Sequence, residues 1–535
     1  MEFLGGLSLS LSQPEGEPEP AGPYDVQRCL ELLDGLLGAE RDRLLGEEAS
    51  SAESSSAGSA LDEVRFMARL EHLTDRTQGF TPHLEQMIDA VFEPLRGECL
   101  TTLGFCPADL PRVVRAHVSA RQEVFQGRLE QARSIPKSQL KGLPVPEEWA
   151  LMSWVIFGLV NPRGDTTTQE LAGRAGLAER DVRAALEALT SEWGCQPGFR
   201  HLGSPNRFRR YPVLRGTPGR YSIPLAWSIL HEVFGWFRDL TSAQALEPLR
   251  RQYHQARAAA TETLVTQTLV EVFGNDRVLS NVEYPIGGGN WAEVDAVVRL
   301  GDHALVVEAK GHAISDRFRV GDTDYAEFHF LDVVSKAFSQ SDRAARYLAE
   351  GGDKLRMKDG GPRVEWTPVA GTTRVAVSFE RIDPFVLAAT RLAAEHQSAP
   401  PTWVVCLADL LMVADILREP YEFYAYAALR AELAADPVVA LLSEADVLGA
   451  FLNDRLESYR RLVGRGPTSV VMLDHHSQEL NAYYSAVTAG LSVERPALRL
   501  PAGIADSLRG LDADSPGWAA DVRRLLARQS NSDAP

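Results

Sequence analysis

The pattern of apolar and polar positions divides the chain into helical regions near both ends and an α/β region between them. Near the start, Leu, Val and Phe recur at helical spacing over residues 26–37 and 60–133. Two stretches rich in Pro, Glu, Ser and Gly, SQPEGEPEPAGP and EEASSAESSSAGSA, have the composition of flexible linkers. We therefore expect residues 1–148 to form a helical region with disordered linkers.

Two short amphipathic helices joined by a tight turn are predicted within residues 149–240, in the stretch TTTQELAGRAGLAERDVRAALEALTSEW. Ala172 is small enough to let the helices approach, and Gly176 can adopt the left-handed conformation of a turn. Val182 and Leu186 supply the shared apolar core. This spacing resembles a helix-turn-helix, and the following GFRHLGSPNRFRRYPVLRGTPGRYSIP is a candidate wing, so the segment is expected to be winged-helix-like.

Arginine residues concentrate in that candidate wing. No Asp or Glu occurs between Glu192 and Glu232, although the whole chain of 535 residues carries a net charge of −18. An acidic chain needs a local basic surface to bind nucleic acid, so this stretch is the candidate DNA-contacting surface. The candidate nucleic-acid-binding residues are Arg200, Arg207, Arg209, Arg210 and Arg215. Two alternatives stay open, because helix-turn-helix units also serve as packing or dimerisation modules and arginines also cover solvated faces.

From residue 241 the expected order is helix, three strands, helix, strand, helix and strand. The expected positions are a helix over 243–273, the strand RVLSNVEYPIG, a hairpin over 293–311, a helix over 330–350, a strand over 373–380, a further helix, and the strand TWVVC. Antiparallel strands followed by crossover helices predict a mixed sheet with helices on its faces. We expect this α/β domain to span residues 241–420 and a C-terminal helical region to span 421–535.

The hairpin EVDAVVRLGDHALVVEAKG is apolar in its middle and charged at one end. Gly301 and Asp302 are expected to form a two-residue type II′ turn, with Gly at the first central position. Counting outward from this turn places Asp295 directly across from Glu308, with Lys310 on the same face, while the opposite face is wholly apolar.

Facing carboxylates destabilise a sheet unless a positive charge lies between them. Carboxylate oxygens and water are the ligands that Mg²⁺ prefers, so Asp295 and Glu308 are candidate ligands for Mg²⁺, with Mn²⁺ as a substitute. The ammonium of Lys310 could activate an attacking water or stabilise charge on a phosphate. The alternative is a solvated strand edge with a surface ion pair.

At these residues the sequence resembles the PD-(D/E)XK, or restriction-endonuclease-like, nuclease superfamily. Asp295 corresponds to the Asp of the motif, and Glu308 and Lys310 belong to its (D/E)XK part, although Val294 replaces the proline before the Asp. The resemblance covers about residues 243–417. It implies an αβββαβ nuclease core, a mixed sheet flanked by helices, within a mostly α multidomain chain.

The resemblance implies further site residues on the flanking helices. Nucleases of this superfamily often carry an acidic residue on the helix before the sheet, and Glu262 is the best-placed candidate, with Glu271 as the alternative. Branches similar to RecB and to the nuclease-related NERD proteins place a Gln on the following helix. Gln340 fits that position, and Tyr347 follows about two turns later.

The resulting hypothesis is a Mg²⁺-dependent deoxyribonuclease, and the resemblance suggests a role in defence against foreign DNA or in DNA repair. One alternative is a catalytically idle nuclease fold that binds or senses DNA. Another is a scaffold that acts through protein partners or as a homo-oligomer. No Walker A loop is present, so ATP-driven movement would need a partner.

Three further features bear on compartment and on a rival chemistry. The five cysteines form no CxxC pair, which fits a reducing cytoplasm. No signal peptide is expected from the N-terminal sequence, and the most apolar stretch, TWVVCLADLLMVADIL, is too short to cross a membrane. The triplet Asp474-His475-His476 resembles one motif of the DHH phosphoesterases, but the partner motifs are missing, and we interpret it as the start of a helix.

Overall fold

The computed structural model describes two compact units. The described residues are 79–134, 166–199, 206–312, 335–381, 401–434, 439–441, 443–456, 471–473 and 476–527, with a few isolated positions before residue 40. The first unit contains residues 88–256, and the second contains 78–87 and the residues from 257 onward. One division between the units falls within α13 (Glu247–Phe273). Most of the expected helix over 26–37 lies outside the described residues.

The first unit packs helices around an aromatic core. Its helices are α5 (Arg96–Leu103), α6 (Leu110–Ser134), α9 (Thr168–Ala175), α10 (Glu179–Ala188), α11 (Arg207–Arg210) and α12 (Ser228–Leu240), with the end of α4 (Thr81–Phe92) and 3-10 turns at Pro107–Asp109 and Gln244–Leu246. The ring of Phe92 stacks on Phe234 and on Tyr253, at centroid distances of 5.9 and 5.7 Å. The hydroxyl of Tyr253 donates to the carbonyl of Phe234 at 2.9 Å, so the aromatic contact is fixed by a hydrogen bond.

The two short helices predicted before residue 193 are observed as α9 and α10. Gly176 ends α9 with φ +64°, a conformation that glycine adopts without steric cost. Thr167 begins the helix, because its hydroxyl accepts a hydrogen bond from the Glu170 amide at 3.2 Å. The strands β1 (Thr166–Thr167), β2 (Thr190–Ser191), β3 (Val213–Arg215) and β4 (Arg220–Ser222) form a small sheet in the order β1-β4-β3-β2. The strands β3 and β4 form an antiparallel hairpin within the stretch expected to be a wing.

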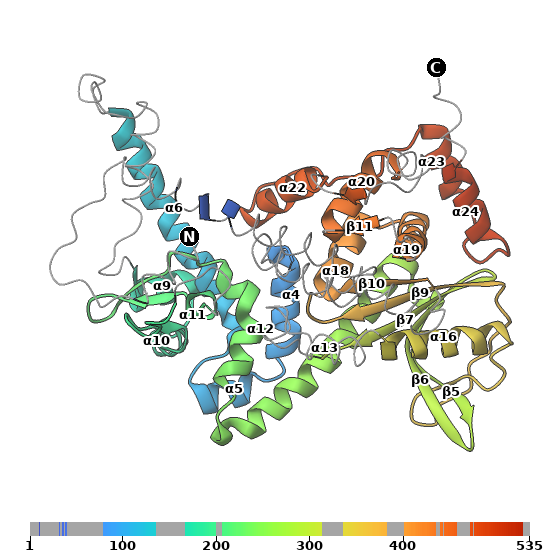
Figure 1. The fold of residues 1–535 in the computed structure, drawn as a ribbon, viewed down its shortest axis with the longest axis horizontal. Coiled ribbons are helices and arrows are strands. Elements are labelled where there is room, and N and C mark those ends of the chain that lie inside the picture. The colour runs from blue at the N-terminus through green and yellow to red at the C-terminus, as the bar shows by residue number, and fades with distance from the viewer. Residues whose placement is uncertain are drawn as a thin grey trace, which may run out of the picture. The chain divides into compact units, whose positions relative to one another are not determined.

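The second unit is built on a six-stranded mixed sheet, as the order of predicted elements indicated (Figure 1). Its strands are β5 (Val278–Gly287), β6 (Asn290–Leu300), β7 (His303–Lys310), β8 (Arg356–Met357), β9 (Gly371–Ser378) and β10 (Thr402–Cys406). The strand order is β10-β9-β7-β6-β5-β8. The strands β5, β6 and β7 are antiparallel, whereas β9 runs parallel to β7 and β10 runs parallel to β9.

Helices cover both faces of this sheet. On one face Val306 shares a buried cluster with Ala344 and Leu348 of α16 (Lys336–Ala349). On the other face Trp403 packs edge-on against Phe423 of α19 (Pro420–Ala434), with ring centroids 6.0 Å apart. The helix α19, which begins at the expected boundary of residue 420, packs on the sheet through aromatic residues that contact Trp403 of β10.

The rest of the second unit is mostly helical. Its elements are a 3-10 turn at Asn275–Arg277 after α13, helices α18 (Leu407–Ile416), α20 (Glu444–Asp454), α22 (Gln478–Thr488), α23 (Ala502–Arg509) and α24 (Trp518–Ala527), and the parallel pair β11 (Val439–Leu441) and β12 (Val471–Leu473). None of the described helices combines the length and the apolar composition that crossing a bilayer requires.

The predicted hairpin register is confirmed over most of its length. Leu300 pairs with His303 and Val297 pairs with Val306, as counting from the turn required. Gly301 has φ +61°, and Asp302 is not among the described residues with positive φ, which is the pattern of a type II′ turn.

Substitution of Gly301 by Ala is expected to destabilise the second unit by about 2 kcal/mol or more. The left-handed conformation alone costs an L-residue about 1–2 kcal/mol, and a Cβ atom there would lie 2.1 Å from the carbonyl oxygen of Ser515. Urea unfolding measures the change. The matched control is Gly219→Ala, which has φ +76° but open space where the added Cβ would lie, so it tests the conformational cost without the clash. Equal losses in the two variants would contradict the predicted role of the Ser515 contact.

A buried ion pair ties α19 to α20. Two nitrogens of Arg430 donate to the two oxygens of the Glu444 carboxylate, both at 2.8 Å, and the hydroxyl of Tyr426 donates to the same carboxylate at 2.6 Å. Removing one partner leaves a buried, uncompensated charge, so Glu444→Ala is expected to cost about 3 kcal/mol of unfolding free energy. A double-mutant cycle with Arg430→Met measures the coupling, and a coupling near zero would contradict this interpretation.

Candidate active site

The strands β6 and β7 separate at the charged end of the hairpin. Their pairing ends at Ala296 and Val307, so the predicted strand pairing of Asp295 with Glu308 is not observed. Beyond the paired part, the carboxylate of Asp295 accepts a hydrogen bond from the main-chain amide of Ala309 at 2.6 Å. The carboxylate therefore takes the place of a main-chain acceptor and holds Asp295 against β7. The neighbouring strand β5 is irregular at the same level, where Asn281 has φ +51°.

This irregularity changes which side chains share a face. Strict alternation would place Val294 and Val297 on opposite faces, as the sequence predicted, yet both belong to the buried cluster against α16. The alternation is therefore interrupted between them, at the position of Asp295. The physical reason is that Asp295 is paired neither with a residue of β5 nor with a residue of β7.

Glu308 is a buried carboxylate, and one of its oxygens is unpaired in the described part of the chain. The residue is 1% exposed, and its Oε2 accepts from Nζ of Lys310 at 3.3 Å. Oε1 is buried and has no hydrogen-bond partner among the described residues. The pKa of Glu308 is raised to about 8, first by burial and then by the charge of Asp295, against the opposing effect of Lys310. Burial also raises the pKa of Asp295, while the hydrogen bond from Ala309 lowers it.

The structure brings Glu262 to this group and leaves Glu271 away from it. Glu262 lies on α13, is half-buried, and has a pKa raised first by burial and then by the charge of Asp295, with Lys310 lowering it. Glu271 is exposed on the same helix. Of the two acidic residues proposed for the helix before the sheet, Glu262 is the one in electrostatic contact with the hairpin carboxylates.

Gln340 and Tyr347 lie on α16, the helix that packs on β7. Oε1 of Gln340 is buried and makes no hydrogen bond with the described residues. The hydroxyl of Tyr347 accepts from the amide of Lys354 at 2.8 Å, and its ring stacks on Tyr284 at a centroid distance of 5.2 Å. Tyr347 therefore supports neighbouring chain segments, whereas Gln340 has an acceptor that the described residues do not use.

Sequence reasoning missed four charged or polar neighbours of the site. Glu293 pairs with Lys358 at 2.8 Å, and the charge of Lys358 lowers the pKa of Asp295. Arg343 and Tyr284 form a second pair, which interacts electrostatically with Glu308. Glu293 could have been found by its position two residues before Asp295, since alternate residues share a strand face. Nothing local in the sequence connects Lys358, Arg343 or Tyr284 with this hairpin.

The candidate DNA-contacting arginines of the first unit are largely paired with carboxylates. Arg209 forms an ion pair with Glu232, and Arg210 forms ion pairs with Glu232 and Asp239. Arg215 forms ion pairs with Glu187 and Glu192. These carboxylates lie at or beyond the two ends of the acid-free stretch, so folding supplies negative charge that the stretch itself lacks.

Two arginines differ from this pattern. The guanidinium of Arg207 lies 4.1 Å from the ring centroid of Tyr211, and its residue is exposed. Arg200 lies outside the described residues. DNA contact by these five arginines stays a prediction, with a weaker local positive field than the sequence indicated.

The rival DHH-like triplet lies mostly outside the described residues, namely Asp474 and His475. The main-chain amide of His476 donates to the carboxylate of Asp446 at 2.9 Å. This is a main-chain contact and gives no sign of a second metal site at His476.

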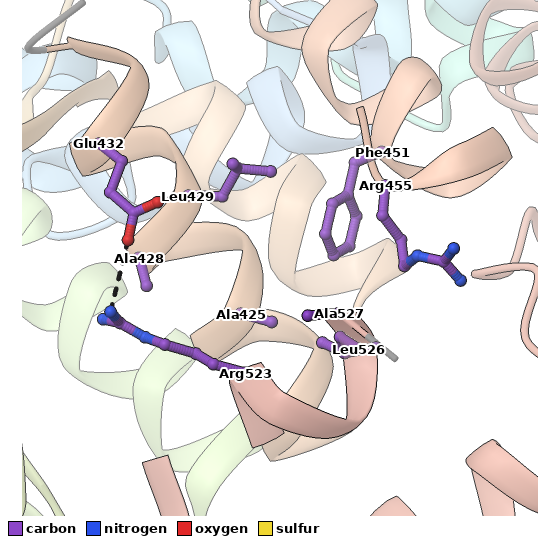
Figure 2. Close-up of a pocket in the computed structure, with 9 residues that line it drawn as sticks. All are labelled: Ala425, Ala428, Leu429, Glu432, Phe451, Arg455, Arg523, Leu526 and Ala527. Carbon is purple, nitrogen blue, oxygen red and sulfur yellow. Dashed lines mark hydrogen bonds and ion pairs between the residues drawn. The ribbon is translucent and has the colours of Figure 1, made fainter. Parts of the chain in front are cut away.

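A separate pocket of about 190 Å³ lies among α19, α20 and α24 of the second unit (Figure 2). Small and apolar side chains, including Leu429 and Phe451, make up most of its lining. Arg523 and Glu432 form an ion pair at 3.3 Å among the lining residues, as the dashed line in Figure 2 marks. No candidate site residue lines this pocket, so it plays no part in the chemistry considered for the hairpin.

The carboxylate group on the hairpin fits a hard divalent cation. Asp295 and the unpaired oxygen of Glu308 provide oxygen ligands, and a buried acceptor without a donor is an arrangement that a cation would satisfy. Within the described parts of the chain, no three His, Cys, Asp or Glu side chains form a complete ligand set. Mg²⁺ is often bound by one or two carboxylates with water and substrate oxygens as the other ligands, so two carboxylates suffice.

Comparison with known proteins gives no further guide to this site, since no protein-family model, curated protein or solved structure matches the chain.

Proposed function

We propose that this chain is a divalent-metal-dependent nuclease that hydrolyses phosphodiester bonds of DNA. The observation that supports it most is the buried Glu308 carboxylate, which lies beside Asp295 and Lys310 and has one oxygen that no described residue pairs with. A carboxylate this buried and this short of donors is a poor structural element, and clustered groups with raised pKa are typical of catalytic sites. The resemblance of these residues to the PD-(D/E)XK motif supports the same reaction.

Each residue of the site has a chemical role under this proposal. Asp295 and Glu308 would hold Mg²⁺ or Mn²⁺, which when bound supplies positive charge at the scissile phosphate and makes a water more acidic. The ammonium of Lys310, already in contact with Glu308, orients the attacking water or stabilises charge on the phosphate oxygens. Glu262 would place a further carboxylate near Asp295, and the free acceptor of Gln340 would orient water at the site.

Cleavage assays with purified protein test this proposal. Supercoiled, linear and single-stranded DNA, and RNA of matched length, are incubated with Mg²⁺, Mn²⁺ or EDTA. Cleavage of DNA that depends on the metal is the expected result, and nicking of the supercoiled form would show endonuclease action. If neither metal supports cleavage of any of these substrates, the proposal fails and the catalytically idle DNA-binding fold becomes the better interpretation.

Anomalous scattering from Mn²⁺-soaked crystals provides an independent test. Mn²⁺ ligated by Asp295 and Glu308 is expected. A manganese peak elsewhere, with these two side chains free of metal, would contradict the ligand assignment even if cleavage is observed.

A further inference from the structure

A second cationic group lies on the α16 side of the candidate site. Nε of Arg343 donates to the hydroxyl of Tyr284 at 3.2 Å, joining α16 to β5. Tyr284 is buried, and its ring stacks on Tyr347, so the hydroxyl that receives Arg343 is held in place. The anchor of Arg343 is therefore rigid, although the arginine itself is exposed.

The position of Arg343 on its helix directs it toward the candidate site. Arg343 follows Gln340 by three residues, so the two side chains lie on the same face of α16. Neighbouring Ala344 and Ala345 are buried in the cluster that contains Val306, two residues before Glu308 on β7. The charge of Arg343 acts on Glu308 and lowers its pKa, which agrees with this placement.

Most donors of the Arg343 guanidinium have no partner among the described residues. One nitrogen, Nε, is used by Tyr284, and no carboxylate is paired with the group in the part of the chain that the structure describes. Arg346, one turn further along α16, differs in this respect, because it pairs with Asp342 at 2.6 Å. With both terminal nitrogens unpaired by any described residue, the guanidinium matches the geometry of a phosphate group, which it can bind through two parallel hydrogen bonds.

We propose that Arg343 binds a backbone phosphate of the nucleic acid at this site and that Tyr284 is its positioning residue. The inference rests on the proposed nuclease function and adds a substrate-binding residue to it. A bound phosphate would accept from the two terminal nitrogens of Arg343, while Nε stays bonded to Tyr284. A phosphodiester adjacent to the one being cleaved fits this chemistry, because Lys310 and the carboxylates already occupy the cleavage position.

The test uses the full chain and compares two arginines that carry the same charge on the same helix. Arg343→Gln is the test variant, and Arg346→Gln is the matched control. The probe for binding is a fluorescein-labelled single-stranded DNA of 12 nucleotides, measured by anisotropy in EDTA at several salt concentrations. Cleavage of the same DNA in Mg²⁺ gives kcat and KM.

Arg343→Gln is expected to raise Kd about tenfold, the equivalent of one good charged contact. The salt dependence of binding should fall by about 0.7 in slope, as the loss of one phosphate contact on a single strand requires. In cleavage, KM should rise more than kcat falls. Arg346→Gln should leave Kd within about twofold, because its charge is already matched by Asp342.

Two further variants separate the contact from simple charge and from folding. Arg343→Lys keeps the charge but lacks the planar guanidinium that pairs with a phosphate through two parallel hydrogen bonds, so it should restore binding only in part. Tyr284→Phe keeps the stacked ring and should raise Kd about threefold. In binding free energy this is roughly half the loss expected for Arg343→Gln. Unchanged Kd in Tyr284→Phe would remove Tyr284 from the proposal.

The outcomes distinguish this inference from the proposed function. Equal changes in Arg343→Gln and Arg346→Gln would overturn it, because the effect would then be general electrostatics. A wild-type protein that binds but does not cleave, with binding lost selectively in Arg343→Gln, would support the phosphate contact while the nuclease proposal fails. A wild-type protein that cleaves normally alongside an unaffected Arg343→Gln would leave the nuclease proposal standing and overturn the inference alone. If the wild type neither binds nor cleaves DNA, both fail.

Discussion

Replacing Lys310 with Ala is expected to reduce kcat for metal-dependent DNA cleavage by about 10²–10³-fold. The ammonium contacts Glu308 and is mostly buried, with a side chain 16% exposed, so it acts in a region of low dielectric where loss of one stabilising charge has an effect of this size. Glu308→Gln should have at least as large an effect, because it removes a metal ligand and leaves the lysine without its partner. Steady-state cleavage of a labelled oligonucleotide measures kcat for both variants.

The control for this prediction is Lys354→Ala. Lys354 is an exposed lysine of the same unit, and the contact it makes with Tyr347 uses its main-chain amide, which the substitution preserves. Its activity should match the wild type. Equal activity in Lys310→Ala and Lys354→Ala would rule out the assigned role of Lys310. If EDTA still stopped the reaction in that case, a contaminating metal-dependent nuclease would account for the cleavage.

Without metal, the second unit is expected to lose stability as the pH rises from about 5 to 8. The pKa of Glu308 is raised from 4.5 to about 8 in the folded chain, chiefly because the carboxylate is buried. A raised folded-state pKa means that the folded chain holds the proton more tightly than the unfolded chain does. The stabilisation is therefore complete below the unfolded pKa and is lost as the pH rises through the folded one. Linkage gives a slope of up to about 1.4 kcal/mol per pH unit in this window, and a total of about 4 kcal/mol.

Divalent metal should reverse this pH dependence. Binding at Glu308 requires the ionised form, so Mn²⁺ should stabilise the chain more at pH 8 than at pH 5. Glu308→Gln should flatten the pH profile and remove the stabilisation by Mn²⁺, while Glu271→Gln, an exposed carboxylate on α13, should change neither. Urea unfolding at several pH values, with hydrogen exchange of peptides from β7 to assign the transition, measures these effects. A wild-type profile that is flat from pH 5 to 8 in EDTA would show that Glu308 is ionised in the folded chain.

Much of the second unit was predictable from local rules. The strand TWVVC is observed over the predicted residues as β10, and the hairpin register follows from the turn at Gly301 and from the alternation of side chains. The mixed sheet follows from the order of strands and helices. The proximity of Lys310 to Glu308 also follows, because residues two apart on a strand share a face. The assignment of this core to a nuclease, and the winged-helix interpretation of the first unit, remain proposals.

The sequence by itself determined the turn, the register of the paired part of the hairpin and the residue types at its charged end, because these depend on backbone conformation within a few residues of each position. Only the tertiary structure decided which distant groups join them. It brought Glu262, and not Glu271, to the hairpin carboxylates, and it joined Tyr284 of β5 to Arg343 of α16. It also placed α19 on the sheet. In the first unit it paired Arg210 and Arg215 with carboxylates outside the acid-free stretch. Such pairings depend on how whole elements pack, since burial and electrostatic interactions act across space regardless of separation along the chain.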